Sequence, residues 1–331
     1  MSSAGTNPED LAAFADALRA ARRVTAVCHE NPDADTVGGA VAVALIARAL
    51  GKEWELVSVD RPAPSLDYLP LFDAFARAPT GDADVAVVCD AATLERVGRI
   101  RTECADWFAS ATLVNVDHHK TNDRFGTVNV VDPTAAATCQ VLAATLPSLG
   151  VALDADLATA LLTGIVRDSH GFSDPSTSGD TMRITAEFVD AGAPLAMIHR
   201  RVISELPFEA LALWGRLLGS LGSHRGGQVI YTTLLPEMLD ATGATDQDAD
   251  GLAELIGKAR GADVSLLLRA SGPAATRVSV RVTEAVDATR IAGVFGGGGH
   301  ARRAGCTIPE PADRALPLLL AACDRVMDSP V

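Results

Sequence analysis

Short apolar runs alternate with helical patterns through the first half of the chain, and this alternation most constrains how the chain can fold. The segments DVAVVCD (84–90) and ATLVNVD (111–117) are almost continuously apolar. Such runs are typical of strands that are buried on both faces of a parallel sheet. Helical patterns separate and follow them, so the sequence predicts an α/β fold with a parallel sheet at its centre.

The same reasoning places the individual elements of this first half. Asn7 and Pro8 mark the start of an N-terminal helix, because Asn caps a helix and Pro suits its first turn. We further expect strands over 24–29, 54–59, 84–90 and 111–117, and helices over 36–51, 134–149, 155–167 and 178–191.

A second set of predicted helices and strands begins at about residue 207. We expect a long helix (207–222), strands over 228–234, 262–269 and 276–282, helices over 250–259 and 287–295, a short strand, and a last helix from about 311. A chain of 331 residues is long enough for about two domains. The sequence predicts an N-terminal parallel-sheet domain over 1–200, a linker helix region over 201–225, and a smaller α/β domain over 226–331.

Composition excludes several classes of partner. A net charge of −14 and an aromatic content of 4% argue against coating long nucleic acid, because such binding depends on phosphate neutralisation and base stacking. No apolar run reaches the roughly 18 residues that span a bilayer, and the acidic N-terminus has no signal-peptide pattern. The six cysteines show no C-x-x-C pairing, which argues against a zinc ribbon or a disulfide framework. We expect a cytoplasmic protein without a membrane partner, and a homodimer stays open.

Potential metal ligands follow the predicted strands. His29 comes directly after the run VTAVC, Asp90 follows DVAVVC, and the triplet Asp117, His118 and His119 follows ATLVNV. The carboxyl ends of parallel strands meet at one edge of a sheet. We therefore expect these side chains to converge there.

Three further acids extend this group. Asp33 and Asp35 lie in CHENPDADTVGG, and Asp168 lies in LLTGIVRDSHGF after another apolar run. Carboxylates mixed with imidazoles suit a divalent ion such as Mn²⁺ and need no thiolate. The set is too large for one tetrahedral site, and it suits two metal ions roughly 3.5–4 Å apart that share a carboxylate. Such a pair activates a bridging water and holds the oxygens of a displacement at phosphorus.

Simpler interpretations are available for each residue alone. A single Asp at a strand end is more often a turn or helix-cap residue, and a His-His pair is usually a surface or core feature. The joint occurrence at three strand ends favours a metal site. Cys28 and Cys89 adjoin the candidate ligands, but neighbouring strand residues face opposite ways, so we expect both cysteines to be buried packing residues.

Four segments resemble, in order, the motifs of the DHH phosphoesterase superfamily: HENPDADTVGG, VVCDAA, VDHH and GIVRDSHGF. The later segment FGGGGHARRAG is similar to the glycine-rich signature of the DHHA1 domain that accompanies these motifs. The resemblance covers roughly residues 15–325. The length and two-domain layout look most like the nanoRNase/pAp-phosphatase group. Its members cleave very short oligoribonucleotides, 3′-phosphoadenosine 5′-phosphate (pAp) and, in some cases, linear or cyclic dinucleotides.

The resemblance implies an active site in the cleft between the two domains, with two divalent ions, Mn²⁺ first and Mg²⁺ or Co²⁺ as alternatives. It implies one ion bound by His29, Asp33 and Asp90, and a second bound by Asp35, Asp90, His118 and Asp168. Asp117 would orient the histidines. His119 would contact the scissile phosphate or assist the leaving oxygen.

The glycine-rich segment also has a physical interpretation. Consecutive glycines let the backbone approach a ligand and direct N–H groups at an anion. Between Gly261 and Gly305 there are six Arg against three acidic residues, so short phosphates would be attracted there. Taken alone, the glycines are equally a flexible turn and Arg281 an exposed strand residue. The resemblance implies a set of substrate-binding residues, namely Arg281, Gly298, Gly299, His300 and Arg302.

The sequence departs from the family pattern at a few positions. Where D-T-G-S-F-R is common, this chain has DSHGFS, so Ser173 replaces the Arg and His170 is added. Gly39 replaces a usual Ser, and Arg303 replaces a common Ala. The expected metal ligands are all kept, so these changes bear on substrate preference.

Two classes of function stay open at this point. The first is a metal-dependent phosphohydrolase that acts on pAp, short oligoribonucleotides or linear dinucleotides. Within that class a RecJ-type single-strand DNA exonuclease is the alternative, and the glycine-rich signature argues against an inorganic pyrophosphatase. The rival class is a nucleotide-binding sensor with a vestigial site, although the presence of every expected ligand counts against it.

Overall fold

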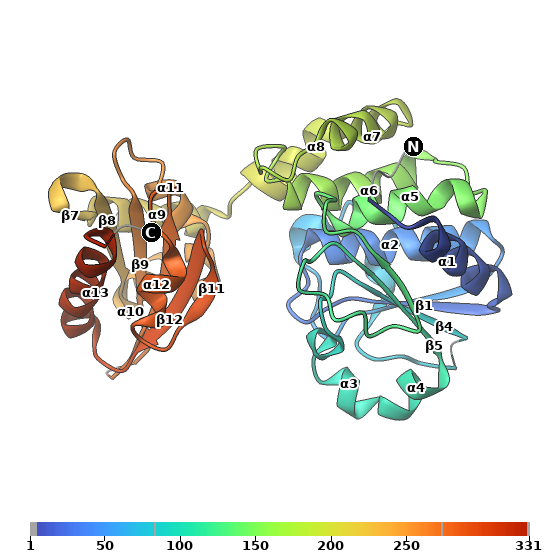
Figure 1. Cartoon of the computed structure of the whole chain (residues 1–331), viewed down its shortest axis with the longest axis horizontal. Coiled ribbons are helices and arrows are strands. Elements are labelled where there is room, and N and C mark those ends of the chain that lie inside the picture. Colours follow the sequence, from blue (N-terminus) through green and yellow to red (C-terminus); the bar gives the residue numbers. More distant parts are fainter. Residues whose placement is uncertain (1–4, 83, 273, 330–331) are drawn as a thin grey trace. The chain divides into compact units, whose positions relative to one another are not determined.

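The computed structural model of the chain describes residues 5–82, 84–272 and 274–329. The chain divides into two compact units, Met1–Glu205 and Leu206–Val331. The boundary lies within the 201–225 segment that the sequence assigns to a linker. Each unit is an α/β unit with a six-stranded sheet of its own (Figure 1). The predicted fold class is confirmed.

All strand pairs of the first sheet are parallel, in the order β3-β2-β1-β4-β5-β6. The strand order reverses between β1 and β4, and in such sheets ligands bind outside the carboxyl ends of the strands at this point. The strands are β1 (Arg23–Val27), β2 (Glu53–Val57), β3 (Phe75–Ala76), β4 (Val85–Cys89), β5 (Thr112–Asp117) and β6 (Val128–Val131).

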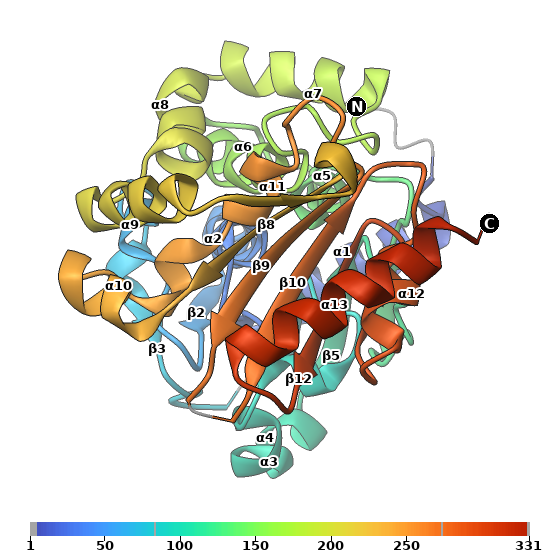
Figure 2. The ribbon, with the colours of Figure 1, turned by 90° about the vertical axis from the view of Figure 1, so that its left-hand side faces the viewer.

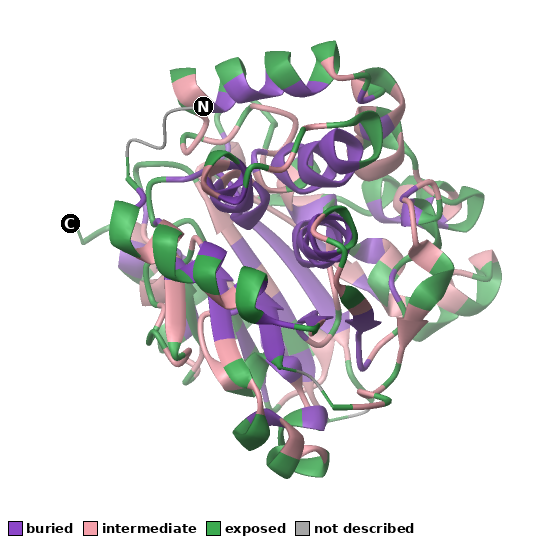
Figure 3. Ribbon diagram, turned by 90° about the vertical axis from the view of Figure 1, so that its right-hand side faces the viewer, coloured by how far each residue is buried: buried purple, intermediate pink, exposed green. Residues whose placement is uncertain are grey.

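Alternate residues of the central strands face two different helical layers. Ala26 and Val87 belong to the larger core, which includes buried residues of α1, α2, α5 and α6, whereas Val27 and Val88 pack with residues around α3 and α4. Figure 3 shows the resulting buried strands and helices of this unit. The helices are α1 (Pro8–Ala20), α2 (Ala34–Ala49), α3 (Ile100–Glu103), α4 (Ala105–Ser110), α5 (Thr138–Leu149), α6 (Ala155–Asp168), α7 (Gly179–Asp190) and α8 (Leu195–His199), followed by a π-helical turn (Arg200–Ser204).

Helices α2 and α6 approach each other through glycines. A Cβ on Gly38 would lie 2.5 Å from the carbonyl oxygen of Ala160, and a Cβ on Gly164 would overlap both the Asp35 carboxylate and the Cys139 sulfur. Only a residue without a side chain allows this close approach. The contact places the first turn of α2, which carries Asp35, directly against α6.

The second sheet is mixed, in the order β11-β12-β10-β9-β8-β7. Only β8 and β9 among these paired strands are parallel. Helices α12 and α13 pack beside β9, β10 and β12 (Figure 2). The strands are β7 (Gly222–His224), β8 (Val229–Leu234), β9 (Val264–Ala270), β10 (Thr276–Val282), β11 (Gly298–His300) and β12 (Arg303–Ile308), and the helices are α9 (Phe208–Gly219), α10 (Pro236–Thr242), α11 (Leu252–Ile256), α12 (Ala288–Gly293) and α13 (Ala312–Met327).

Several elements differ from the sequence-based expectation. Helix α9, all of which lies in the segment assigned to a linker, packs into the second unit, where Leu213 and Leu217 join a core with Leu234 and Leu252. The short elements β3, β6, β7, α3, α4, α8 and α10 were not predicted, because such segments take their conformation from their neighbours. The glycine-rich segment is partly a strand, since Gly298–His300 pairs with β12. Among the described residues, no helix is both long and apolar enough to cross a membrane.

Candidate metal centre and candidate substrate-binding residues

The candidate ligands of the first unit follow the strands on either side of the topological switch point. His29 follows β1, Asp90 follows β4 directly, and Asp117 is the last residue of β5. The backbone of Asp90 lies in the left-handed region, with a φ of 62°. This conformation is uncommon for a residue other than glycine, and such outliers cluster at functional sites. The three buried side chains lie where the sequence placed them.

Asp33 is a helix cap, and it also belongs to one group of candidate ligands. It is the N-cap of α2, and its Oδ1 accepts hydrogen bonds from the backbone N–H groups of Asp35 (3.0 Å) and Thr36 (3.2 Å). The same oxygen lies 3.7 Å from Nε2 of His29. One carboxylate therefore caps α2 and also lies beside the candidate ligand His29.

Asp35 joins two helices. Its carboxylate accepts the backbone N–H groups of Thr138 (2.7 Å) and Cys139 (3.0 Å), at the start of α5. Ala137, the N-cap residue of α5, has no side-chain acceptor, so Asp35 supplies the missing cap. The Thr138 hydroxyl also donates to Asp90 Oδ1 at 2.9 Å. Helix α5 thereby fixes two candidate ligands at once.

Asp90 lies between two groups of potential ligands. Its Oδ2 lies 3.6 Å from Nε2 of His29, and its Oδ1 lies 3.6 Å from Nε2 of His118. The donor atoms within each group lie within 4.8 Å of one another, and the groups are His29, Asp33 and Asp90, and Asp35, Asp90, His118 and Asp168. The two oxygens of one carboxylate thus face different sets of donors.

His118 has the orientation of a ligand. Its Nδ1 lies 3.3 Å from the carbonyl oxygen of Ala135, and its Nε2 lies 3.1 Å from Oδ2 of Asp168, the last residue of α6. Nε2 is buried and has no hydrogen-bond partner of acceptable geometry within the described part of the chain. A backbone contact that fixes one ring nitrogen and directs the other at the remaining candidate ligands is the usual arrangement of a metal-binding histidine.

His119 is held differently. Its Nδ1 lies 2.7 Å from Asp117 Oδ1, and the other Asp117 oxygen accepts a hydrogen bond from Asn122 at 2.6 Å. The ring is 45% exposed. Asp117 therefore fixes the tautomer that leaves Nε2 available, and it raises the pKa of His119. A third donor group, Asp90 with His118 and His119, overlaps the other two.

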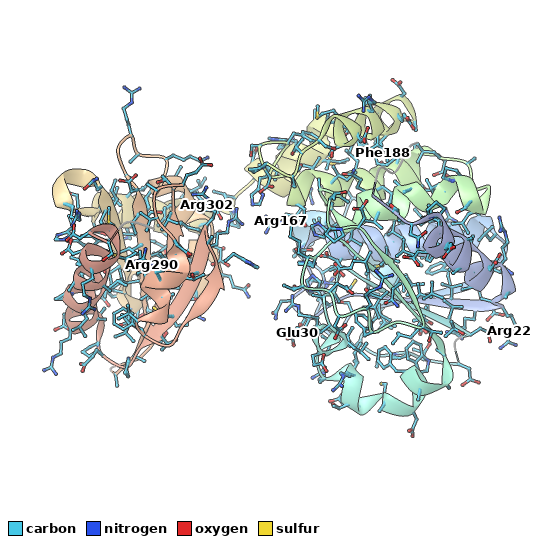
Figure 4. The ribbon with its side chains drawn as sticks, viewed as in Figure 1. Arg22, Glu30, Arg167, Phe188, Arg290 and Arg302 are labelled. Carbon is cyan, nitrogen blue, oxygen red and sulfur yellow. The ribbon has the colours of Figure 1, made fainter. Side chains whose placement is uncertain are left out.

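The electrostatics of the first group favour positive charge. Burial opposes protonation of His29, but Asp33 and Asp90 outweigh it and raise the pKa of His29 to about 10. Burial opposes ionisation of Asp33, but His29 outweighs it and lowers the pKa of Asp33 to about 2. The Nδ1 of His29 lies 2.8 Å from the carbonyl oxygen of Glu30, which directs Nε2 toward the two carboxylates (Glu30 is labelled in Figure 4).

The second group has an excess of negative charge. Burial and the charges of Asp90 and Asp168 raise the pKa of Asp35. Burial also raises the pKa of Asp168, despite its contact with His118. A divalent cation would offset this repulsion, and carboxylates with imidazole are ligands that Mn²⁺ and Mg²⁺ accept. The donor set, with Nε2 of His118 directed at the carboxylates of Asp168 and Asp90, therefore fits a divalent metal ion.

A cavity of about 370 Å³ opens beside these groups, and its lining includes His119 and Arg96. The sequence analysis did not identify Arg96, which follows Asp90 on a short 3₁₀ helix. It also missed Thr138 and Asn122, because their contacts with aspartates depend on tertiary structure. His170 belongs to none of the donor groups found among the described residues, and its Nδ1 lies 3.1 Å from the carbonyl oxygen of Asp168.

In the second unit, strand pairing brings most of the predicted substrate-binding residues to one face. Arg281 of β10 is paired with Arg303 of β12, which is paired with His300 of β11. Gly298 is two residues from His300 and shares its face, and Gly299 points the other way. One residue of α11 also contacts this face, since a single oxygen of Glu254 lies 3.3 Å from Arg281 and 3.4 Å from Arg303.

Arg302 lies apart from this set. It occupies the turn between β11 and β12 (Arg302 is labelled in Figure 4), and its guanidinium pairs with the exposed Glu284 at 3.1 Å. The assignment of these residues to substrate binding stays a prediction, as do the individual roles of the candidate metal ligands.

Comparison with known proteins places the chain in a class. Residues 23–165 match the DHH family, N-terminal domain, and residues 226–329 match the DHHA1 domain. The bifunctional oligoribonuclease and PAP phosphatase NrnA of Thermus thermophilus is 34% identical over 284 residues, which are 85% of this chain and 82% of that protein. The chain belongs to the DHH family and is a phosphoesterase.

Two solved structures share the fold. An exopolyphosphatase-related protein from Bacteroides fragilis has a TM-score of 0.89 at 18% identity, with 99% of both chains covered. RecJ from Thermus thermophilus in complex with Mn²⁺ has a TM-score of 0.54 at 16% identity, covering 98% of this chain and 55% of that one.

Proposed function

We propose that this phosphoesterase hydrolyses short oligoribonucleotides, linear dinucleotides of the pApA type and pAp. The observation that carries the proposal is the position of Asp90, whose two oxygens face separate donor groups. This arrangement suits two metal ions that share one carboxylate. The names of NrnA relatives and their similarity over most of the chain support the substrate class.

The metal ions are assigned to the two donor groups. His29 and Asp33 would bind one ion, Asp35, His118 and Asp168 would bind the other, and Asp90 would bind both. When bound, such ions supply an activated water and neutralise charge on the phosphoryl oxygens. We propose Mn²⁺ as the native ion, which the Mn²⁺ complex of the similar RecJ structure supports; Mg²⁺ and Co²⁺ are the alternatives.

The chain's own residues position the substrate and move protons. His119 lines the cavity, and its Nδ1 is held by Asp117. We assign to Nε2 of His119 the contact with the scissile phosphate and the donation of a proton to the leaving oxygen. A water oxygen forms the new bond to phosphorus and gives up a proton to the solvent, while the P–O bond to the leaving group breaks and the leaving oxygen takes the proton from His119. Arg281 and His300 would bind the non-scissile phosphate of the same substrate.

A product assay tests the proposal. Purified protein with Mn²⁺ is offered pAp, pApA, a long RNA and pyrophosphate in parallel. Turnover of pAp and pApA, with the long RNA and pyrophosphate spared, is the expected result. Turnover of the long RNA or pyrophosphate alone would contradict the short-substrate assignment. Binding of pApA at saturating Mn²⁺ without turnover would instead favour the nucleotide-sensor alternative.

We extend the proposal to partners and location. The net charge of −14 argues against a stable complex with long nucleic acid. We propose a cytoplasmic enzyme whose partners are short nucleotide substrates.

A further inference from the structure

The face of the second sheet that carries Arg281 has further polar residues along β10. Side chains two residues apart in a strand share a face, so Arg277, Ser279 and Arg281 project from the same side of β10. We call these three residues, together with their partners Thr307, Gly305 and Arg303 on β12, the polar strip. The intervening Val278 and Val280 are buried in the core on the opposite face.

A cavity of about 560 Å³ lies at the Arg277 end of the polar strip. The residues that line it include Arg269, Arg277, Ser279, Phe295, Gly296 and Thr307, whereas Arg281 and His300 are not among them. Arg277 and Arg281 are four residues apart in β10, which corresponds to ~13 Å along the strand. This distance exceeds one nucleotide step.

Two guanidinium groups reach the cavity from adjacent strands. Arg269 of β9 is the register partner of Arg277. Asp246 accepts hydrogen bonds from both arginines, and Asp250 accepts one from Arg269 at 2.5 Å. Neither aspartate is among the residues that line the cavity. The aspartates therefore hold the guanidinium planes without closing the cavity.

Hydrogen-bond donors are left over at this position. A guanidinium has five N–H donors, and the two aspartates use only some of them. Arg269 is 9% exposed, and its Nε has no hydrogen-bond partner within the described residues. The hydroxyls of Ser279 and Thr307 add further donors. Arginines with nearby hydroxyls are the groups that bind phosphate in a fixed orientation.

We infer that this cavity is a second phosphate subsite, which binds a phosphodiester of an oligoribonucleotide longer than a dinucleotide. The inference rests on the proposed function, in which Arg281 binds a phosphate at the other end of the polar strip. Arg277 then acts as a specificity residue for chain length. It increases affinity for longer oligoribonucleotides and has no contact with pAp.

The test compares Arg277→Gln with Arg314→Gln. Arg314 is a control of equal charge change, because it is 75% exposed on α13, outside the cavity. Binding is measured by fluorescence anisotropy, with a labelled tetraribonucleotide that carries non-hydrolysable phosphorothioate linkages, and by competition with pAp. Loss of one charge-assisted contact predicts roughly tenfold weaker binding of the tetraribonucleotide by Arg277→Gln. We expect unchanged binding of pAp and partial recovery of tetraribonucleotide binding with Arg277→Lys.

The outcomes separate this inference from the proposed function. If Arg277→Gln weakened the binding of pAp and of the tetraribonucleotide equally, or weakened neither, the second subsite would be wrong. Turnover of pAp by the wild-type protein would in that case still support the proposed function. If the wild-type protein neither bound nor cleaved any oligoribonucleotide, both would fall. Thermal melting of each variant shows whether a loss of binding reflects unfolding instead.

Discussion

At the scale of single residues, the candidate metal centre depends on carboxylates that have two partners each. Asp33 caps α2 and faces His29, Asp35 caps α5 and faces the second donor group, and the two oxygens of Asp90 face His29 and His118. A ligand that also has a structural hydrogen bond is held in place before metal binds. Such preorganisation keeps the entropic cost of binding low.

Asp90→Asn tests the bridging position. The substitution keeps the shape of the side chain but removes its charge, so we expect both metal ions to bind more weakly. Activity on pAp should fall by more than about a hundredfold, the upper end of what even outer partners of a metal ligand contribute. Titration calorimetry with Mn²⁺ and a pAp turnover assay measure the two effects. Asp156→Asn, a half-exposed aspartate of α6 outside the donor groups, is the matched control. Wild-type turnover in Asp90→Asn would show the two-metal assignment to be wrong.

Asn122→Ala tests the orientation of His119. Asn122 donates to Asp117, which in turn contacts Nδ1 of His119. We expect kcat to fall about 10- to 100-fold, the effect typical of a residue that orients a functional histidine, with Mn²⁺ affinity preserved. A parallel loss of Mn²⁺ affinity would mean that Asn122 supports the metal centre as a whole.

Arg281→Ala tests the substrate-binding role of the second unit. Arg281 is partly exposed and pairs with Glu254, so its loss should leave the fold intact. We expect a rise in KM for pAp of roughly tenfold or more, with a smaller change in kcat, because a charge-assisted contact to a remote phosphate is lost. Steady-state kinetics separates the two parameters. A fall in kcat at constant KM would contradict the assignment.

At the scale of elements, close packing of α2 against α6 positions the site. Gly164 of α6 lies against Asp35 and Cys139, the residues at which α2 and α5 meet. A side chain at this point cannot be accommodated without moving the Asp35 carboxylate. The packing of α2 against α6 therefore also fixes the position of the Asp35 carboxylate.

Gly164→Ala should damage both stability and metal binding. Overpacking of a tight core position costs typically ~1–3 kcal/mol, and displacement of Asp35 should weaken Mn²⁺ binding further. Gly215→Ala in α9 is the control, because a Cβ there meets no atom within 4 Å; Ala in a helix interior should stabilise by roughly 0.5–1 kcal/mol. Denaturant unfolding measures both variants. A neutral Gly164→Ala would show that α6 can shift without cost.

At the scale of the whole molecule, each unit has a core of its own. The first unit contains two clusters, built on the two faces of the parallel sheet, and the second contains two clusters built on the mixed sheet. The candidate metal ligands belong to the first unit alone. Metal binding should therefore raise the free energy of unfolding of the first unit and leave that of the second unchanged.

Differential scanning calorimetry of the full chain tests this expectation. We expect two unfolding transitions, of which Mn²⁺ raises only the one that belongs to the first unit. At a free concentration one hundred times Kd, binding adds about 2.7 kcal/mol, which corresponds to several degrees for a unit of this size. Addition of a chelator should reverse the shift. Equal shifts of both transitions would contradict a metal centre that is confined to the first unit.

The sequence by itself determined the α/β class, the parallel sheet and the candidate ligands at the strand ends. Apolar runs such as VAVVC are typical of strands that are buried on both faces of a sheet, and polar residues that follow such strands lie at the carboxyl edge of a parallel sheet. The resemblance to the family motifs added the division of these candidate ligands into two groups, one for each metal ion. These properties are local or follow from the topology of parallel strands.

Only the tertiary structure decided which side chains support the site. Thr138 and Asp35 are far apart in sequence, yet they hydrogen-bond because Gly38 and Gly164 let α2 and α6 approach closely. The strand character of Gly298–His300 likewise depends on pairing with β12. The polar strip of the second sheet follows from strand register, which a single sequence does not encode at short range. Contacts between distant segments depend on how complete elements pack, and local composition carries little information about that packing.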